Sequence, residues 1–434
     1  MKNERINNPI KAELLAPAGS YQKLLTALHF GADAVYVGGK QFSLRTFADN
    51  FTPEELASAI ELAHSMGKKV YVTTNIFAKN ADFGLLQEYF KTLEQIHADG
   101  AIISDPGAIY VAKKVAPTLP IHLSTQANTT NKYAVKFWGE QGVERVVLAR
   151  ELSLKEISEI HDYAPEIELE AFVHGAMCIS YSGRCLLSDY LDGRSSNRGA
   201  CVQSCRWKYE VRALNATNGK SEWLPIEEDG KGTFIFNSKD LNMLSHLQQM
   251  EGAGVCSFKI EGRMKSGYYL ATVINAYRRL MDGGKLSVSE QELFSVAHRD
   301  YTTAYTLGEN SETVNYDDSQ SKGDCVYIAD VLGMDGEYVL AEMRNRFRQG
   351  DKLEVLSPVN NLENLSLSRR CTIPKGSVRR TGNSCRKFTK SNARICLKKG
   401  IIFVEERNEA YEKNIVDCHR RNDCFADWSD GIGS

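Results

Sequence analysis

Four of the chain's eleven cysteines lie in one segment, at Cys178, Cys185, Cys201 and Cys205, with the spacing C-x6-C-x15-C-x3-C. Thiolates are soft ligands, and four of them in one loop system can hold a tetrahedral zinc ion or an iron–sulfur cluster. Structural zinc sites favour closely paired cysteines, and only Cys201 and Cys205 are spaced in that way. The spacing therefore favours an iron–sulfur cluster of the 4Fe-4S type, with zinc and unligated thiols as the alternatives.

Basic side chains accompany these cysteines. Guanidinium groups match the geometry of phosphate and carboxylate, so this set predicts a polyanion or a small dicarboxylate as the ligand. Countercharge for the thiolates is the alternative explanation. The candidate substrate-binding residues are Arg45, Asn75, Gln126, Arg184, Arg206, Lys259 and Arg263.

Three further residues are candidates for acid–base catalysis: Glu170, His174 and Glu261. We place them at or near the carboxyl ends of predicted strands, which in a barrel face the active site. The alternatives are that the glutamates only form ion pairs with Lys259 or Arg263, and that His174 is structural. The sequence contains no HExxH, GxSxG or P-loop motif, which argues against the hydrolases and nucleotide-binding proteins that carry those motifs.

Eight short apolar runs, each followed by an amphipathic stretch, must position these residues. Near-continuous apolar runs are typical of parallel strands that are buried on both faces. Predicted helix caps at Ser20, Thr52 and Ser153 support the alternation. Eight strand–helix repeats predict an α/β fold of the (β/α)8, TIM-like barrel type. The predicted strands span 13–19, 34–39, 70–75, 101–105, 121–126, 145–150, 167–175 and 256–263.

The predicted domains follow from where this pattern breaks. About 80 residues separate the seventh and eighth strands, far more than the roughly 2–6 of an ordinary barrel loop. We therefore predict a barrel over 13–299 with a cysteine-rich insertion at about 176–255, preceded by an N-terminal extension over 1–12. Short strand-like pieces predict a small antiparallel β domain over 300–405, and a polar tail follows over 406–434.

Composition limits the class of protein. The 434 residues carry a formal net charge of −2, which excludes a globally basic nucleic-acid coat but leaves room for a local basic cleft. No apolar run reaches the roughly 18 residues of a membrane span, and the N-terminus has no apolar signal core. An odd number of cysteines is a poor basis for a disulfide framework. We therefore expect a soluble, cytoplasmic protein that does not bind membranes.

The segment over 170–188, EAFVHGAMCISYSGRCLLS, resembles the signature of the collagenase-like peptidase family of the U class. ELLAPAG, AVYVGG, NRGACVQSCRWKY, FNSKDL and FKIEGRMKS strengthen the likeness, which covers about residues 13–358. Some members were described as proteases, whereas other branches are oxygen-independent hydroxylases that use an iron–sulfur cluster. The blocks CRWKY and KIEGRMKS are most similar to the branch that hydroxylates transfer RNA.

That resemblance implies a specific activity. The chain would convert the wobble uridine of tRNA to 5-hydroxyuridine, with prephenate as the hydroxyl donor and an unidentified electron donor. The cluster ligands of the family correspond here to Cys178, Cys185, Cys201 and Cys205. A peptidase and a non-catalytic, metal-bearing RNA-binding protein are the alternative functions.

Overall fold

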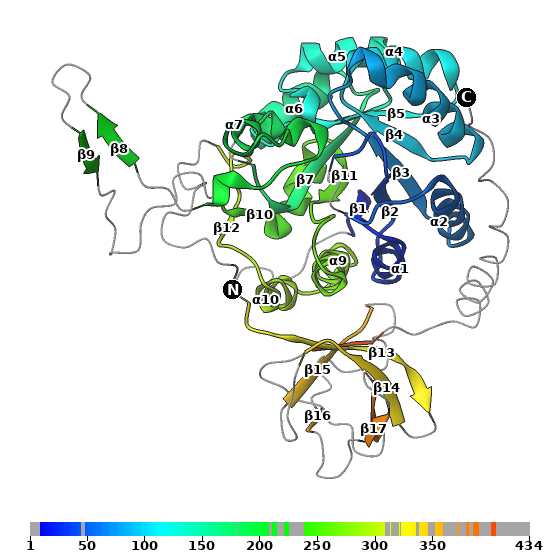
Figure 1. Cartoon of the computed structure of the whole chain (residues 1–434), viewed down its shortest axis with the longest axis vertical. Helices are drawn as coiled ribbons and strands as arrows, with labels where there is room; N and C mark the ends of the chain where they lie inside the picture. Colours follow the sequence, from blue (N-terminus) through cyan, green and yellow to red (C-terminus); the bar gives the residue numbers. More distant parts are fainter. Residues whose placement is uncertain are drawn as a thin grey trace, which may run out of the picture. The chain divides into compact units, whose positions relative to one another are not determined.

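Eight parallel strands close into a barrel in a computed structural model of the chain (Figure 1). Each strand from β1 to β6 pairs with the next, and β11 closes the ring by pairing with both β7 and β1. All five residues of β2 are buried, as expected for a strand covered on both faces. The predicted TIM-like barrel is confirmed. Its strands are β1 (Glu13–Pro17), β2 (Ala34–Gly38), β3 (Lys69–Thr74), β4 (Gly100–Ile103), β5 (Ile121–Leu123), β6 (Arg145–Val147), β7 (Glu168–Ala176) and β11 (Val255–Ile260).

Helices alternate with the strands and surround the barrel (Figure 1). Ser20, Thr52 and Ser153 accept hydrogen bonds from the first turns of α1, α2 and α6, as predicted. Such caps typically stabilise a helix by about 1 kcal/mol. The helices are α1 (Tyr21–His29), α2 (Pro53–Ser65), α3 (Phe83–Gln95), α4 (Pro106–Val115), α5 (Lys132–Glu140), α6 (Leu154–Tyr163), α7 (Leu187–Asp192), α8 (Leu247–Gly252), α9 (Gly267–Met281) and α10 (Leu286–Ser295).

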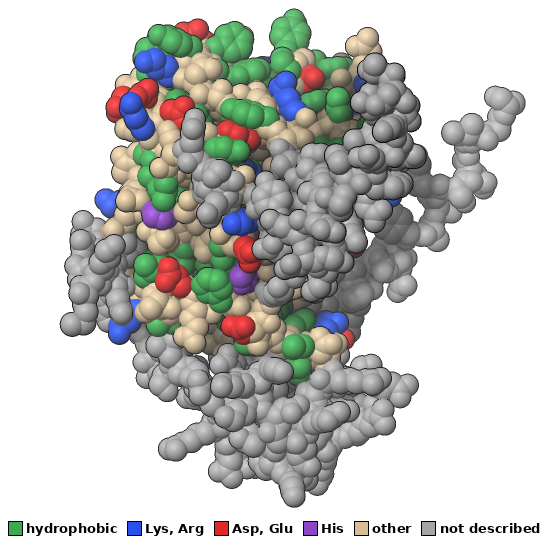
Figure 2. All heavy atoms as spheres, turned by 90° about the vertical axis from the view of Figure 1, so that its left-hand side faces the viewer, with side chains coloured by type: hydrophobic (Ala, Val, Ile, Leu, Met, Phe, Trp, Pro, Cys, Tyr) green, Lys and Arg blue, Asp and Glu red, His purple; other side chains and the backbone are tan. Residues whose placement is uncertain are grey.

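The chain divides into two units, Met1–Asp324 and Cys325–Ser434. In the part of the chain that the structure describes, no helix has the length and hydropathy needed to cross a membrane. On the face shown in Figure 2, exposed hydrophobic side chains lie among charged ones. The described residues are 9–44, 48–178, 180–207, 211–214, 221–224, 238–308, 313, 321, 323–335, 338–345, 352–358, 371–372, 379–381, 385–389 and 401–404.

The predicted insertion occupies residues 177–254, between β7 and β11. It returns to the barrel through β10, which pairs antiparallel with the end of β7. β12 then pairs in parallel with β10. The first unit extends to Asp324, so residue 299, where we expected the barrel domain to end, lies inside this unit. The short elements of this region are η3 (Tyr181–Gly183), η4 (Ser196–Arg198), η5 (Ser204–Arg206), β8 (Val211–Leu214), β9 (Ser221–Leu224), β10 (Asp240–Asn242), η6 (Leu244–His246) and β12 (Tyr301–Thr302).

The second unit contains a sheet in which seven strands are described, in the order β16-β15-β19-β13-β14-β18-β17. β19 pairs in parallel with both β13 and β15, because the last described strand of the chain inserts between them. The other described pairs of this sheet are antiparallel, so the sheet is mixed where we expected an antiparallel domain. The predicted tail and residues 1–8 lie outside the described residues. The strands are β13 (Tyr327–Asp335), β14 (Tyr338–Met343), β15 (Lys352–Leu356), β16 (Cys371–Thr372), β17 (Arg379–Thr381), β18 (Cys385–Thr389) and β19 (Ile401–Val404).

Candidate active site

The four predicted metal ligands lie on the loops that follow β7. All four are free thiols; Cys178 is exposed and the others are partly buried. Burial raises the pKa of Cys205, Arg206 opposes that shift, and the charges of Cys178, Cys201 and Cys185 raise it further. Cys205 therefore lies within electrostatic reach of the other three thiols. In this arrangement the four thiols are not yet a ligand set, since no group of three or more His, Cys, Asp or Glu residues among the described ones could hold a metal ion.

Two of the thiols already accept backbone hydrogen bonds. The Leu187 amide donates to Cys185 Sγ at 3.3 Å, and the Gln203 amide donates to Cys201 Sγ at 3.4 Å. Gln203 adopts a left-handed conformation, with φ of 58°, which turns the chain sharply after Cys201. Hydrogen bonds to sulfur stabilise thiolate ligands and tune the potential of iron–sulfur clusters. The donor set and its hydrogen bonds have the chemistry of a thiolate cluster site, although the four sulfur atoms are not positioned as ligands in this structure.

Contacts with three barrel loops hold the cysteine-bearing segment. The partners follow β3, β5 and β6, so the segment lies across the carboxyl ends of these strands, which we call the mouth of the barrel. Barrel enzymes carry their chemistry at this end. The contacts are Arg198 Nη1 to Phe77 O at 2.8 Å and to Asp82 Oδ2 at 2.9 Å, Asn128 Nδ2 to Tyr181 O at 3.3 Å, and Ser182 Oγ to Glu151 Oε2 at 2.5 Å.

Three cations gather around one buried carboxylate beside Cys205; we call Arg206, Lys265, Arg299 and Asp240 the cation group. Arg299 donates to Asp240 Oδ1 through Nε at 3.1 Å and Nη2 at 2.5 Å. Burial opposes ionisation of Asp240, but Arg299 and Lys265 outweigh it and keep the pKa of Asp240 below its ordinary value. Burial lowers the pKa of Arg206, and Arg299 lowers it further. The excess positive charge suits an anionic ligand.

Three members of the cation group, Lys265, Asp240 and Arg299, were not among the predicted site residues. Asp240 lies within the FNSKDL segment, and membership of this family-like motif was the signal that could have found it. Arg299 had no local signal, because its partner lies 59 residues earlier in the chain. Only the pairing of β10 with β12 brings the two side chains together.

His174 is buried on β7 among aromatic rings. Its Nδ1 lies 3.4 Å from the Tyr277 hydroxyl, and the rings of Tyr269 and Tyr301 also contact it. Burial lowers the pKa of His174 to about 3, and the nearby Asp240 only partly opposes this shift. Its Nε2 is buried and has no hydrogen-bond partner among the described residues. The ring is therefore neutral near pH 7 and offers Nε2 for a hydrogen bond rather than carrying an imidazolium charge.

We expect the first unit to lose stability as the pH falls from about 6.5 towards 3, because His122 and His174 are both held neutral by burial. Each has a folded pKa of about 3 and an unfolded pKa of about 6.5. Between these values only the unfolded state binds the proton, so stability falls by about 1.4 kcal/mol per pH unit for each histidine. Denaturant unfolding over this pH range measures the slope. His122→Gln should flatten it, and an unchanged slope in that variant would contradict the explanation.

Arg263 reaches across the mouth from the turn after β11. Its Nη1 donates to Ser43 Oγ at 2.8 Å and to Thr73 Oγ1 at 2.7 Å. A Cβ at Gly38 would lie 2.6 Å from that nitrogen, and a Cβ at Gly19 would lie 2.3 Å from the Arg263 carbonyl oxygen. The glycines of ELLAPAG and AVYVGG are therefore needed where this segment packs onto β1 and β2.

Glu261 lies beside His174. Its amide donates to the His174 carbonyl at 2.8 Å, and the Tyr36 hydroxyl donates to Oε2 at 3.3 Å. Gly175 has a φ of +103°, and a Cβ there would lie 2.4 Å from the Glu261 carbonyl oxygen. The glycine of the HGA motif thus allows β7 to approach the turn after β11. The structure brings these two predicted catalytic residues together.

Glu170 and Lys259 lie inside the barrel rather than at its mouth. Glu170 is the third residue of β7, which continues to Ala176, so its expected position at a strand end was wrong. Lys259 Nζ donates to Glu170 at 2.5 Å, and Arg145 Nη1 donates at 3.3 Å. Burial opposes the charged form of Glu170, but these two cations outweigh it and lower the pKa. The pairing with Lys259 that we gave as the alternative is present.

Three of the remaining candidates lie at the mouth. Asn75 Oδ1 accepts from the Leu44 amide at 3.3 Å, and Arg184 Nε donates to the Gln126 carbonyl at 3.2 Å. Arg184 thereby ties the cysteine-bearing segment to the loop after β5. Arg45 lies outside the described residues and stays a prediction.

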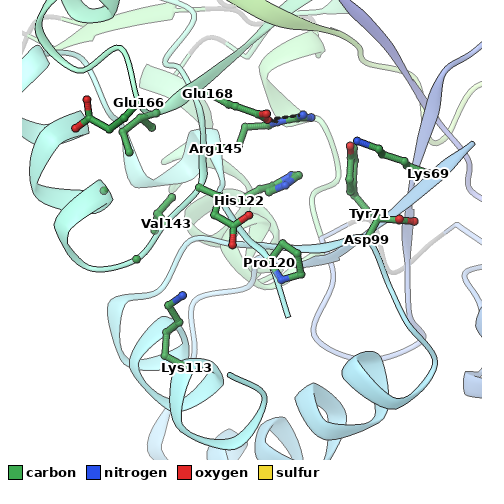
Figure 3. Close-up of a pocket in the computed structure, with 14 residues that line it drawn as sticks. Lys69, Tyr71, Asp99, Lys113, Pro120, His122, Val143, Arg145, Glu166 and Glu168 are labelled. Atoms are coloured by element: carbon green, nitrogen blue, oxygen red, sulfur yellow. Dashed lines mark hydrogen bonds and ion pairs between the residues drawn. The ribbon is translucent and has the colours of Figure 1, made fainter. Parts of the chain in front are cut away.

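A cavity of about 670 Å³ opens at the opposite end of the barrel, where the strands begin (Figure 3). Lys69, Arg145 and Glu168, the first residues of β3, β6 and β7, line it together with His122. Arg145 is paired with Glu168 there (Figure 3). The sequence pattern did not indicate this cavity, because it pointed only to residues at the carboxyl ends of the strands. Since barrel enzymes carry their chemistry at the carboxyl ends of the strands, the mouth is the candidate active site.

Comparison with known proteins relates the chain to one family. A profile described as Peptidase family U32 matches residues 19–316. "tRNA hydroxylation protein P1" of Bacillus subtilis (strain 168) is 42% identical over 368 residues, which are 80% of this chain and 84% of the relative. "tRNA hydroxylation protein P" of Escherichia coli (strain K12) is 37% identical over 396 residues, covering 81% and 87%. "Collagenase" of Porphyromonas gingivalis (strain ATCC BAA-308 / W83) is 32% identical over 316 residues, covering 68% and 74%.

Proposed function

The chain belongs to peptidase family U32, and from this membership and the geometry of the mouth we propose that it is a tRNA-modifying enzyme. It hydroxylates the wobble uridine to 5-hydroxyuridine without O2, with prephenate as the hydroxyl donor. Replacing C–H by C–OH removes two electrons from the base, and these electrons pass to a separate redox partner. A 4Fe-4S cluster held by Cys178, Cys185, Cys201 and Cys205 completes the proposal. Two relatives that match four fifths of the chain are named for tRNA hydroxylation, which supports it.

The observation that carries the proposal is the cation group beside Cys205. Its three cations lie around Asp240, and Glu261 also acts on Lys265, so an anionic carboxylate such as those of prephenate would complete the charge balance. Arg206 and Lys265 would hold the carboxylates, and burial around Asp240 would exclude water from them. His174 would offer Nε2 of a neutral ring for a hydrogen bond. When bound, a cluster supplies one-electron transfer.

The mouth also suits an RNA base better than a base pair. An enzyme that acts on a base needs it extruded from the stack, and the unpaired bases of an anticodon loop are the least costly to extrude. Arg184, fixed by the loop after β5, would contact the backbone of such a loop.

Deletion of the gene is expected to remove 5-hydroxyuridine from bulk tRNA, together with the nucleosides derived from it, because the proposed enzyme forms the hydroxylated base. Mass spectrometry of digested tRNA measures the loss. A plasmid copy of the wild-type gene should restore the nucleoside, and a Lys265→Met copy should restore less of it. A nucleoside profile that is unchanged by deletion contradicts the proposal.

A peptidase is the second candidate, because one relative is named Collagenase. Peptide hydrolysis that persists through purification and disappears in Cys178→Ser or in a His174 variant would favour it. A non-catalytic RNA-binding protein would instead bind tRNA with a steep salt dependence and yield no product.

A further inference from the structure

Five of the fifteen large hydrophobic side chains that the described chain exposes lie within residues 181–207. An ordinary soluble domain scatters such residues, whereas a concentration of them marks an interaction site. We call these five residues the aromatic rim. They are Tyr190, 87% exposed, Leu186, 68%, Tyr181, 54%, Trp207, 43%, and Leu191, 42%.

The backbone beneath the aromatic rim is held in place. The buried Ser188 donates from Oγ to the Arg194 carbonyl at 2.7 Å and accepts from the Val202 amide at 3.1 Å, which fixes α7. The Tyr181 carbonyl accepts from Asn128, and the Trp207 amide donates to the Ser204 carbonyl at 2.9 Å. The exposed rings therefore project from a preformed scaffold, which lowers the entropic cost of binding.

The charges between these rings indicate the chemistry of the partner. Residues 180–207 contain four arginines, two aspartates and no lysine or glutamate, a net charge of +4 − 2 = +2. Arg198 pairs with Asp82 at 2.9 Å, and Arg194 lies 3.9 Å from Asp192, where both of these side chains are exposed. Aromatic rings interleaved with arginines are typical of surfaces that bind single-stranded nucleic acid, where bases stack and phosphates pair with guanidinium groups.

We propose that the aromatic rim is the platform on which the unpaired nucleotides next to the target base stack, with Tyr190 and Trp207 as its main positions. This inference rests on the proposed function. Trp207 directly follows Arg206 of the cation group, so a base stacked on it would have its neighbour at the mouth. The rim would thus position the loop of the RNA without touching the reacting atoms.

The test measures how tightly the full-length protein binds an anticodon stem-loop RNA. Tyr190→Ala should bind roughly 5- to 150-fold more weakly, the range expected for one lost base-stacking contact. Tyr190→Phe keeps the ring and should bind like the wild type. Tyr110→Ala is the matched control, since Tyr110 is 62% exposed on α4, outside the rim. All three variants should keep the wild-type iron content and unfolding midpoint.

Three results would overturn the inference: equal binding by Tyr190→Ala and Tyr110→Ala, an equal loss of binding to a blunt RNA duplex, or a change in oligomeric state that marks a protein interface. Failure of the proposed function gives a different pattern. In that case gene deletion leaves the tRNA nucleosides unchanged, while Tyr190→Ala still weakens binding of the stem-loop and the stacking surface stands.

Discussion

Cys205→Ser is expected to abolish both the bound iron and the hydroxylated product. The other three thiols lie within electrostatic reach of Cys205, and Arg206 beside it belongs to the cation group. A serine hydroxyl is a harder ligand than a thiolate and stays protonated near pH 7. Iron analysis of anaerobically purified protein should fall from about four atoms per chain to nearly none. The brown colour and the 5-hydroxyuridine in tRNA should be lost with it.

The matched control is Cys256→Ser, which should leave both properties unchanged. Cys256 is also a partly buried free thiol, and burial raises its pKa to about 11, but its Sγ donates to the Leu169 carbonyl on β7 inside the barrel wall. Iron retained by Cys205→Ser would contradict the ligand assignment. A colourless wild-type protein with one zinc ion per chain would instead indicate a structural site.

The barrel could be predicted because its strands are buried on both faces, and burial leaves a strong local signal. The run over 34–39 illustrates this, since every residue of β2 is buried. The glycines at the ends of the first two predicted strands could also be recognised in the sequence, but the structural reason for them could not. Only the structure shows that Gly19 and Gly38 make room for Arg263, more than 200 residues later in the chain.

Positions set by strand length or distant pairing could not be predicted. Glu170 was expected at a strand end, but β7 extends six residues beyond it because its last residues pair with β10. The same extension brings Arg299 into the site, because β12 pairs with β10 and places Arg299 beside Asp240. In the second unit, the insertion of β19 between β13 and β15 makes the sheet mixed, and no local pattern reports such an insertion.

Glu170→Met is expected to destabilise the first unit by about 3–5 kcal/mol, the usual cost of leaving a buried charge without its partner. Lys259 is buried, and its Nζ donates to Glu170 at 2.5 Å; burial already lowers the pKa of this lysine. Arg145 keeps Glu13 at 2.7 Å, so the loss concentrates on Lys259. Equilibrium unfolding in urea, followed by circular dichroism, measures the change. Glu88→Met at the exposed pair with Lys91 should have no measurable effect.

The double variant Glu170→Met, Lys259→Met distinguishes two roles of Glu170, a structural ion pair and a catalytic carboxylate. Removing both charges leaves an apolar pair of similar volume, so most of the stability should return. If Glu170 only holds the barrel together, tRNA hydroxylation should return with it, because the mouth is built from other residues. A stable double variant that makes no 5-hydroxyuridine would instead show that the reaction needs this carboxylate or its lysine. An unchanged unfolding midpoint in Glu170→Met alone would contradict the buried ion pair itself. An ammonium group without a partner in the barrel interior must lower the stability of the folded state.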